Sequence, residues 1–267
     1  MIKQAIIPLA GLGTRLLPLT SVIPKELLPI NGKPNLEHIL NECIEAGIKR
    51  VILIISNKKY SIKKYFFNDK LYKNILKKKR DKRLENEYKK IKKFKKMITF
   101  VYQNKPRGTG DAVLKCRKYI KDNYFLMLLP DDLIIKKNCS IEMIKLHNQT
   151  KSSVIATKKV PKKEVSRWGI LSYKKNNKFN FRINNVIEKP KINEVKSNFA
   201  IIGRYILPKK IFTEIKKLRP GQGGEIHITD AIRNMIKKNE IFHGCIFKGE
   251  YLDCGTMNGY INSGKKL

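Results

Sequence analysis

Short apolar runs alternate with longer amphipathic segments through the first 160 residues, and this alternation restricts the fold more than any other feature of the sequence. Each apolar run has the length of a buried strand and ends at turn-forming residues. Strands separated by helices of this size need crossover connections, which predicts an α/β fold with a Rossmann-like, doubly wound sheet, mixed but mainly parallel. The expected strands are 4–9, 50–56, 97–103, 124–129 and 152–160, and the expected helices are 35–46, the tract 58–96, 110–120 and 140–150.

After Pro161 the pattern changes to shorter strands and turns. This predicts a small hairpin-rich elaboration over 168–190, packed beside the sheet, followed by a strand at 198–207 and by helices at 229–238 and from 257 onwards. A chain of 267 residues without an internal repeat or a low-complexity linker is expected to form a single domain, 1–267.

The formal net charge is +36, a value that normally points to a polyanionic partner. Here the lysines are spread through the whole chain and accompany abundant Ile and Asn, so we interpret the charge as compositional drift. The densest basic tract, 58–96, carries apolar residues at helical spacing. An amphipathic helix with a solvated basic face is therefore favoured over an RNA-binding surface, and nucleic acid is not an expected partner.

No apolar run approaches the 18 residues of a membrane helix, and the short N-terminal run lacks the layout of a signal peptide, so a cytoplasmic protein with no membrane contact is expected. The five cysteines are scattered and form no CxxC pair, which argues against both a disulfide framework and a zinc site. The isolated histidines are assigned no chemistry. They are His38, His147, His227 and His243.

The stretch AGLGTRLLPLTSVIPKELLP follows the first expected strand. Gly11 and Gly13 at the end of a strand would let backbone N–H groups approach an anion. The guanidinium of Arg15 can bind two phosphate oxygens at once, and Lys25 adds a mobile charge. The spacing fits neither a Walker A loop nor a dinucleotide fingerprint. It favours a nucleoside triphosphate site, with a plain glycine turn flanked by solvated cations as the alternative.

Two acidic segments could hold a divalent cation. LLPDD, 128–132, places Asp131 directly after an apolar strand, and YLDCGTMNGY, 251–260, supplies Asp253 at the end of another. Mg²⁺ usually takes one or two carboxylates and completes its shell with water and phosphate. Either aspartate alone would also be explained by a turn.

Two further segments offer polar side chains beside glycine or at a strand end. Gln103 can pair with the edge of a base, and Gly108 leaves room for a flat ring against the backbone. Glu188 and Lys189 are neighbours, so their side chains point to opposite faces of a strand unless the chain twists there. With a twist, the acid could accept from sugar hydroxyls while the lysine binds a phosphate. A helix N-terminal turn and a surface ion pair are the alternatives.

The order of these segments resembles that of the bacterial UTP–glucose-1-phosphate uridylyltransferases, in the sugar nucleotidyltransferase superfamily. The segments are AGLGTRLLP, IPKELLP, LLPDD, WGIL, VIEKP, SNFAIIGRYIL, GEIHITDAI and DCGTMNGY. The resemblance implies an enzyme that uses Mg²⁺ to join UTP and glucose 1-phosphate. Residues 1–160 would mainly bind the nucleotide, and 161–267 would mainly bind the sugar and add the C-terminal helices. A sister enzyme for another base or sugar is the nearer alternative, and a basic RNA-binding protein on the same fold is the remoter one.

The resemblance also implies a role for each site residue. The uridine part would be held by Ala10, Gly11, Gly13, Thr14, Glu26, Gln103 and Gly108, the triphosphate by Arg15 and Lys25, Mg²⁺ by Asp131 and Asp253, and glucose 1-phosphate by Gly169, Glu188 and Lys189. Arg15, Lys25 and Lys189 would be the catalytic cations. Asp111 and Trp168 stand where relatives commonly have histidine and tyrosine. A homo-oligomer is compatible with the resemblance.

Overall fold

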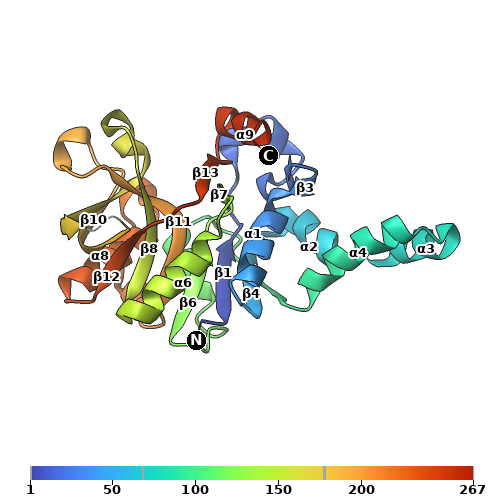
Figure 1. Ribbon diagram of the computed structural model, residues 1–267, viewed down its shortest axis with the longest axis horizontal. Coiled ribbons are helices and arrows are strands. Elements are labelled where there is room, and N and C mark those ends of the chain that lie inside the picture. The colour runs from blue at the N-terminus through green and yellow to red at the C-terminus, as the bar shows by residue number, and fades with distance from the viewer. Residues whose placement is uncertain (1, 68, 177–178, 267) are drawn as a thin grey trace.

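A computed structural model describes residues 2–67, 69–176 and 179–266, and these form a nine-stranded sheet with helices on both faces (Figure 1). Its strand order is β5-β4-β1-β6-β11-β8-β12-β10-β9. The strands in that order are Ile98–Tyr102, Arg50–Ile55, Gln4–Pro8, Tyr124–Leu128, Phe199–Pro208, Ser153–Lys159, Phe242–Ile246, Asn180–Glu188 and Gly169–Asn176. The first four are parallel, so their carboxyl ends meet at one edge of the sheet.

The second half of the sheet is mixed. Strand β11 runs antiparallel between β6 and β8, and β12 is parallel to β8. The hairpin β9–β10 pairs with β12 and β11, so it continues the sheet where the sequence predicted an elaboration packed beside it. The reason is β12, which the sequence pattern did not predict and which supplies an edge for β10.

Alternate strand residues face opposite layers of helices. Ile7, Leu53 and Leu126 pack on the face covered by α1 (Asn35–Glu45) and α6 (Cys139–Thr150). Ile6, Ile52 and Phe125 pack on the face covered by α5 (Thr109–Lys115), α7 (Ile211–Lys217) and α8 (Ile228–Lys237). Because successive strand side chains point to opposite sides, buried runs without polar alternation can serve both layers. The doubly wound α/β prediction is confirmed.

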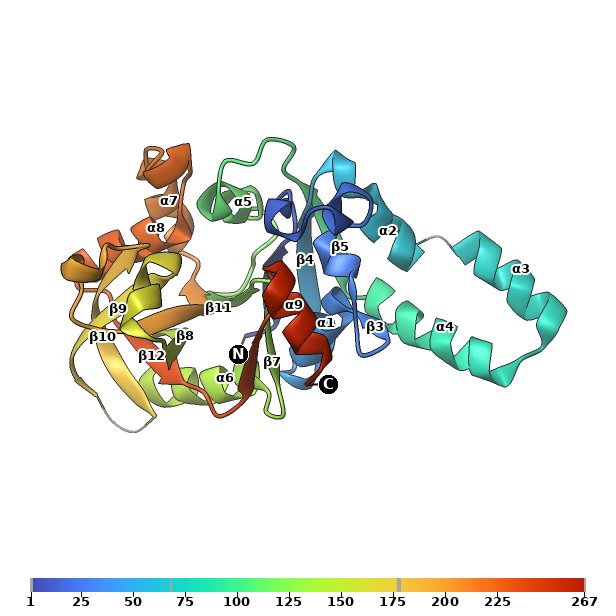
Figure 2. The same ribbon diagram turned by 90° about the horizontal axis from the view of Figure 1, so that it is seen from above.

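The basic tract forms three helices where a single amphipathic helix was expected. They are α2 (Tyr60–Phe67), α3 (Asp69–Lys79) and α4 (Lys82–Lys95). Arg80 adopts a positive φ of 44°, and the Asp81 carboxylate caps α4 by accepting from the Arg83 N–H at 2.7 Å, so the chain reverses between α3 and α4. This helical hairpin projects away from the rest of the molecule (Figure 2), and Phe94 anchors its base in the core.

Small elements near the sheet edge bring distant segments together. Strand β7 (Asp132–Ile135) pairs antiparallel with β13 (Glu250–Asp253), which places Asp132 opposite Asp253. The strands β2 (Pro29–Ile30) and β3 (Lys33–Pro34) form a tight hairpin before α1, and α9 (Met257–Gly264) follows β13. All five cysteines are free and buried. Within the described ranges, every helix is too short or too polar to cross a membrane.

Candidate active site

A cavity of about 840 Å³ lies beyond the carboxyl ends of the parallel strands. Segments that follow β1, β5 and β6 form one side of it, and the end of β10, the start of α8 and the end of β13 form the other. Most residues predicted for the site line this cavity. They are Ala10, Gly11, Thr14, Arg15, Lys25, Gln103, Gly108, Asp131, Gly169, Glu188, Lys189 and Asp253.

The glycine loop after β1 is shaped by its second glycine. Gly13 has a φ of 74°, a left-handed conformation that favours glycine, and its carbonyl accepts from Thr20 Oγ1 at 2.9 Å. The loop turns there into a short 3₁₀ helix, Thr14–Leu16, which points Arg15 towards the cavity with its side chain 66% exposed. Gly13 itself does not line the cavity, so its contribution is the course of the loop.

Lys25 and Asp131 form an ion pair in the cavity. Lys25 Nζ lies 2.6 Å from Asp131 Oδ2 and 2.5 Å from Oδ1, while Arg15 Nη2 is 3.6 Å from the same carboxylate. Burial alone would lower the pKa of Lys25, but the carboxylates of Asp131 and Glu26 outweigh it and hold that pKa above its ordinary value. Lys25 therefore stays cationic and is suited to binding phosphate rather than to accepting a proton.

Glu26 is placed differently from its prediction as a nucleotide-binding residue. The side chain is fully buried outside the cavity, and both carboxylate oxygens accept from Lys59 Nζ at 2.7 and 2.8 Å. Burial raises the pKa of Glu26 and lowers the pKa of Lys59, since desolvation disfavours both charges. In this conformation Glu26 supports the segment that carries Lys25 and does not face a ligand.

Asp131 and Asp253 come from segments joined by a backbone hydrogen bond, in which the Cys254 N–H donates to the Asp131 carbonyl at 2.7 Å. Asp253 accepts from the Gly255 N–H at 2.9 Å and lies 3.6 Å from Arg167 Nη2. Two hard oxygen donors lining one cavity fit Mg²⁺, which needs few protein ligands when phosphates complete its shell. The described residues contain no group of three or more His, Cys, Asp or Glu side chains placed to hold a metal.

Gln103 is held at the side of the cavity expected to receive a base. Its Nε2 donates to Asp111 Oδ2 at 2.7 Å and to the Gly108 carbonyl at 3.3 Å. No described residue donates to its Oε1, which leaves that oxygen as an acceptor for a ligand. Gly108 has a φ of 97°, and a Cβ there would lie 2.6 Å from the Ile226 carbonyl oxygen. Only glycine fits this close approach of the segment that precedes α8.

The twist required for Glu188 and Lys189 to share the cavity is present. Strand β10 ends at Glu188, Lys189 adopts a left-handed φ of 43°, and both residues line the cavity. Glu188 Oε2 accepts from Thr229 Oγ1 at 3.0 Å. A Cβ on Gly169 would lie 3.2 Å from that same oxygen, so the glycine leaves Glu188 accessible.

Several lining residues were assigned no role by sequence reasoning. The guanidinium of Arg167 lies 6.0 Å from the centre of the Trp168 ring and approaches Asp253, and the Tyr251 hydroxyl donates to Asp132 Oδ1 at 2.7 Å. His227 also lines the cavity. His227 lies in the segment GEIHITDAI, one of the segments that carry the family resemblance, and this is the one sequence signal for that residue.

Known proteins are similar to this chain in sequence and in fold over nearly its whole length. Residues 4–267 match the family described as nucleotidyl transferase. The UTP–glucose-1-phosphate uridylyltransferase of Mycoplasma pneumoniae is 38% identical, covering 98% of this chain and 91% of that protein, and the enzyme of the same name from Pseudomonas aeruginosa is 37% identical, covering 98% and 95%. A crystal structure of UDP-glucose pyrophosphorylase complexed with UDP-glucose is 33% identical, with a TM-score of 0.87 over 100% of this chain and 98% of that one.

Proposed function

Because this chain belongs to the nucleotidyl transferase family, we propose that it transfers a uridylyl group from UTP to glucose 1-phosphate, giving UDP-glucose and pyrophosphate. The observation that carries this proposal is the convergence on a single cavity of segments as far apart in the chain as Ala10 and Asp253, which bring cations, carboxylates and an amide together. The solved relative with UDP-glucose, similar along its full length, supports the choice of base and sugar.

The reaction is an in-line displacement at the α-phosphorus of UTP. A phosphate oxygen of glucose 1-phosphate forms the new P–O bond, the bond from the α-phosphorus to the bridging oxygen breaks, and pyrophosphate leaves with that electron pair. The attacking oxygen is already anionic, so no residue has to remove a proton from it. The protein therefore has to align two anions and offset their repulsion.

The cations of the cavity are divided between the two substrates. The backbone at Gly11 together with Arg15 and Lys25 would bind the triphosphate, and Lys189 would bind the phosphate of the sugar. Glu188, kept accessible by Gly169, would accept from sugar hydroxyls. All three cations line the cavity, and there they would offset the charge that develops on the reacting phosphates in the transition state.

Gln103 accounts for selection of uracil over cytosine. The N3 position of uracil carries a donor, whereas N3 of cytosine is an acceptor. Because Asp111 engages the amide nitrogen of Gln103, the amide oxygen is the group left to accept from N3–H. Thymine shares this edge with uracil, so dTTP is the nearest competitor by this contact alone.

Asp131 and Asp253 would hold Mg²⁺, which when bound supplies charge neutralisation on the phosphates. Asp131→Asn keeps the shape of the side chain and removes its charge. We expect the Mg²⁺ concentration for half-maximal rate to rise about tenfold or more. An unaltered Mg²⁺ titration in this variant would move the metal site elsewhere.

The proposed activity is tested by pyrophosphate release from glucose 1-phosphate with UTP, dTTP, ATP, GTP or CTP in parallel. A strong preference for UTP is expected. Preference for another nucleotide would keep the mechanism and reassign the base. No release with any nucleotide or with other sugar phosphates, from protein shown to be folded, would refute the proposal.

A further inference from the structure

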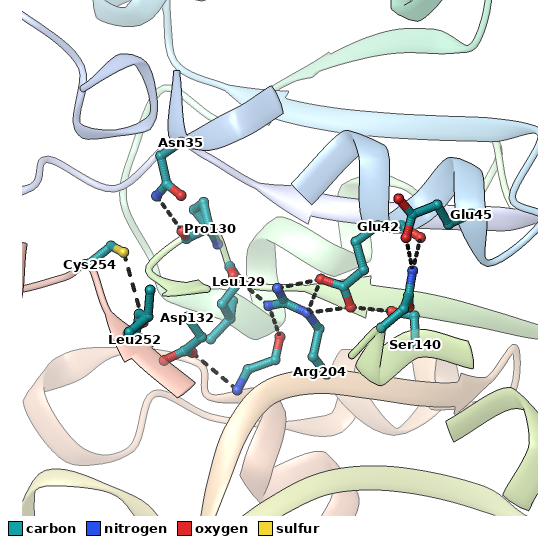
Figure 3. Close-up of polar contacts among 12 residues, drawn as sticks. Asn35, Glu42, Glu45, Leu129, Pro130, Asp132, Ser140, Arg204, Leu252 and Cys254 are labelled. Carbon is teal, nitrogen blue, oxygen red and sulfur yellow. Dashed lines mark hydrogen bonds and ion pairs between the residues drawn. The ribbon is translucent and has the colours of Figure 1, made fainter. Parts of the chain in front are cut away.

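A buried polar network that the proposed chemistry does not use donates hydrogen bonds to the loop that carries Asp131 (Figure 3). We define the acidic loop as residues 129–132. Arg204 of β11 is fully buried, and its guanidinium donates to both carboxylate oxygens of Glu42 on α1 over 2.8–3.1 Å. Ser140 Oγ on α6 donates to Glu42 Oε1 at 2.5 Å. The remaining nitrogen of the fork, Nη1, donates to the Leu129 carbonyl at 2.9 Å.

Three consecutive carbonyls of the acidic loop each accept a specific hydrogen bond. Arg204 binds the first, Asn35 Nδ2 donates to the Pro130 carbonyl at 2.7 Å, and the Cys254 N–H donates to the Asp131 carbonyl at 2.7 Å. Helix α1 thus contributes at both ends, through Asn35 directly and through Glu42 by way of Arg204. The loop cannot move as a unit without breaking these contacts.

Strand β11 adds backbone contacts on the edge that pairs with β6, where Arg204 lies opposite Leu128. On its other edge, the pairing with β8 shifts register between Ile201 and Tyr205. The Gly203 carbonyl accepts from the Leu129 N–H at 2.7 Å, and the Gly203 N–H donates to Asp132 Oδ2 at 3.1 Å. The Arg204 side chain therefore extends from β11 at the point where the strand backbone already contacts the loop.

A buried ion pair is weak grounds for stability, because desolvating two charges offsets much of their attraction. Well-packed apolar residues of similar volume often stabilise a core as well or better. An apolar pair at 42 and 204 could fill the space between β11, α1 and α6, but it could not donate to the Leu129 carbonyl. That third contact requires the planar fork of an arginine whose other nitrogens are already held.

We propose that Arg204, oriented by Glu42, is a positioning residue that fixes the acidic loop so that Asp131 faces Lys25 in the cavity. This inference rests on the proposed function for its kinetic consequence. Residues behind metal-binding groups typically change metal affinity or activity about 10- to 100-fold when they are replaced. We expect that range for kcat, with a rise of about tenfold in the metal concentration for half-saturation and with KM for UTP changing less than kcat.

The decisive variant is the double substitution Glu42→Leu with Arg204→Met, which replaces the ion pair by apolar volume without leaving a buried charge alone. We expect a lower Tm, because Ser140 Oγ and the Leu129 carbonyl lose their partners, together with a kcat reduced about 10- to 100-fold and weaker Mn²⁺ binding measured by EPR titration without substrates. Full activity and unchanged Mn²⁺ affinity in the folded variant would overturn the proposal, because Arg204 would then be structural only.

A milder variant keeps the proposal testable if the double variant does not fold. Arg204→Lys retains a charge for Glu42 but lacks the fork that also reaches Leu129, so the same fall in kcat and Mn²⁺ affinity is expected. Wild-type values in a folded Arg204→Lys protein would refute the positioning role.

A matched control lies at the amino end of β1, outside the residues that line the cavity. Gln4 at the start of β1 is buried, and its amide bonds the Tyr119 carbonyl and the N–H groups of Lys121 and Asp122 at 2.6–3.0 Å. Gln4→Leu should lower Tm with kcat and Mn²⁺ affinity unchanged. If the unaltered protein released no pyrophosphate, the proposed function would fail, while the Mn²⁺ comparison would still decide the role of Arg204.

Discussion

Replacing Lys25 by methionine removes the most buried cation of the cavity while keeping its stem. The Lys25 side chain is 15% exposed and that of Asp131 is 20% exposed, and both carboxylate oxygens lie within 2.6 Å of Nζ. The raised pKa keeps Lys25 charged across the neutral range, so the substitution removes a full charge at any assay pH. Methionine retains the apolar contacts of the lysine stem, so the loss reports on the charge.

The expected effects on stability and on rate have different sizes. Breaking a fully buried pair costs about 3–5 kcal/mol. Here solvent still reaches both side chains, so we expect a fall of about 1–2 kcal/mol in the free energy of unfolding. Loss of a preorganised charge that acts on the transition state costs about 3 kcal/mol, or about a hundredfold in kcat.

Steady-state kinetics with both substrates, at saturating Mg²⁺, separates these contributions. Arg15→Met is the comparison, since Arg15 is 66% exposed and 3.6 Å from Asp131, and its loss should raise KM for UTP more than it lowers kcat. Lys25→Met should do the reverse. An unchanged kcat in Lys25→Met, or a loss carried entirely by KM for UTP, would refute the assignment of Lys25 to the transition state.

Three further outcomes test other parts of the structure. Burial raises the pKa of Asp132 from 3.8 to about 6, so the folded state binds this proton more tightly than the unfolded state does. Relative to Asp132→Asn, the free energy of unfolding should therefore gain about 2 kcal/mol as pH falls from 7 to 4, and parallel pH profiles by chemical denaturation would contradict this. Gly203→Ala would place a Cβ 2.6 Å from Leu129 Cβ, so it should lower stability by about 1–3 kcal/mol and reduce kcat. Gly264→Ala, with open space around the added Cβ, should change neither stability nor kcat in the same assays. The lysines at 77–79 lie on the projecting hairpin, outside the cavity. Replacing all three by glutamine should leave kcat/KM unchanged at physiological salt, and a clear change would give the hairpin a role in substrate capture.

The first half of the fold could be predicted because its signals are local. Each apolar run such as 50–56 is followed by its own helix, and parallel crossovers leave little choice of arrangement. The second half depends on partners far apart in the chain. The run 198–207 is recognisable as a strand, but its place between β6 and β8 is decided by pairing with residues up to about 80 positions away. Strand β12 is short and is interrupted by His243 and Gly244, so periodicity did not separate it from a loop.

The same distinction explains the candidate site. Gly11, Arg15 and Lys25 lie within one segment, so their spacing carries the prediction of a phosphate site. Glu26 shares that segment, yet its side chain turns inward because Lys59, 33 residues later, supplies a buried partner. Arg167 depends on the approach of η5 (Lys162–Arg167) to β13, which no local pattern encodes.

The acids and cations of the cavity contact one another or a neighbouring hydroxyl. Asp131 is paired with Lys25, Asp253 lies beside Arg167, and Glu188 accepts from Thr229. A triphosphate that engaged both Lys25 and Arg15 would leave the Asp131 carboxylate unpaired beside further negative charge, which the partly desolvated cavity penalises. Binding is therefore favourable when a phosphate takes the cation and a cation takes the carboxylate together. If Arg204 fixes the acidic loop as proposed, the hydrogen bonds to its carbonyls would keep Asp131 in position while its partner changes.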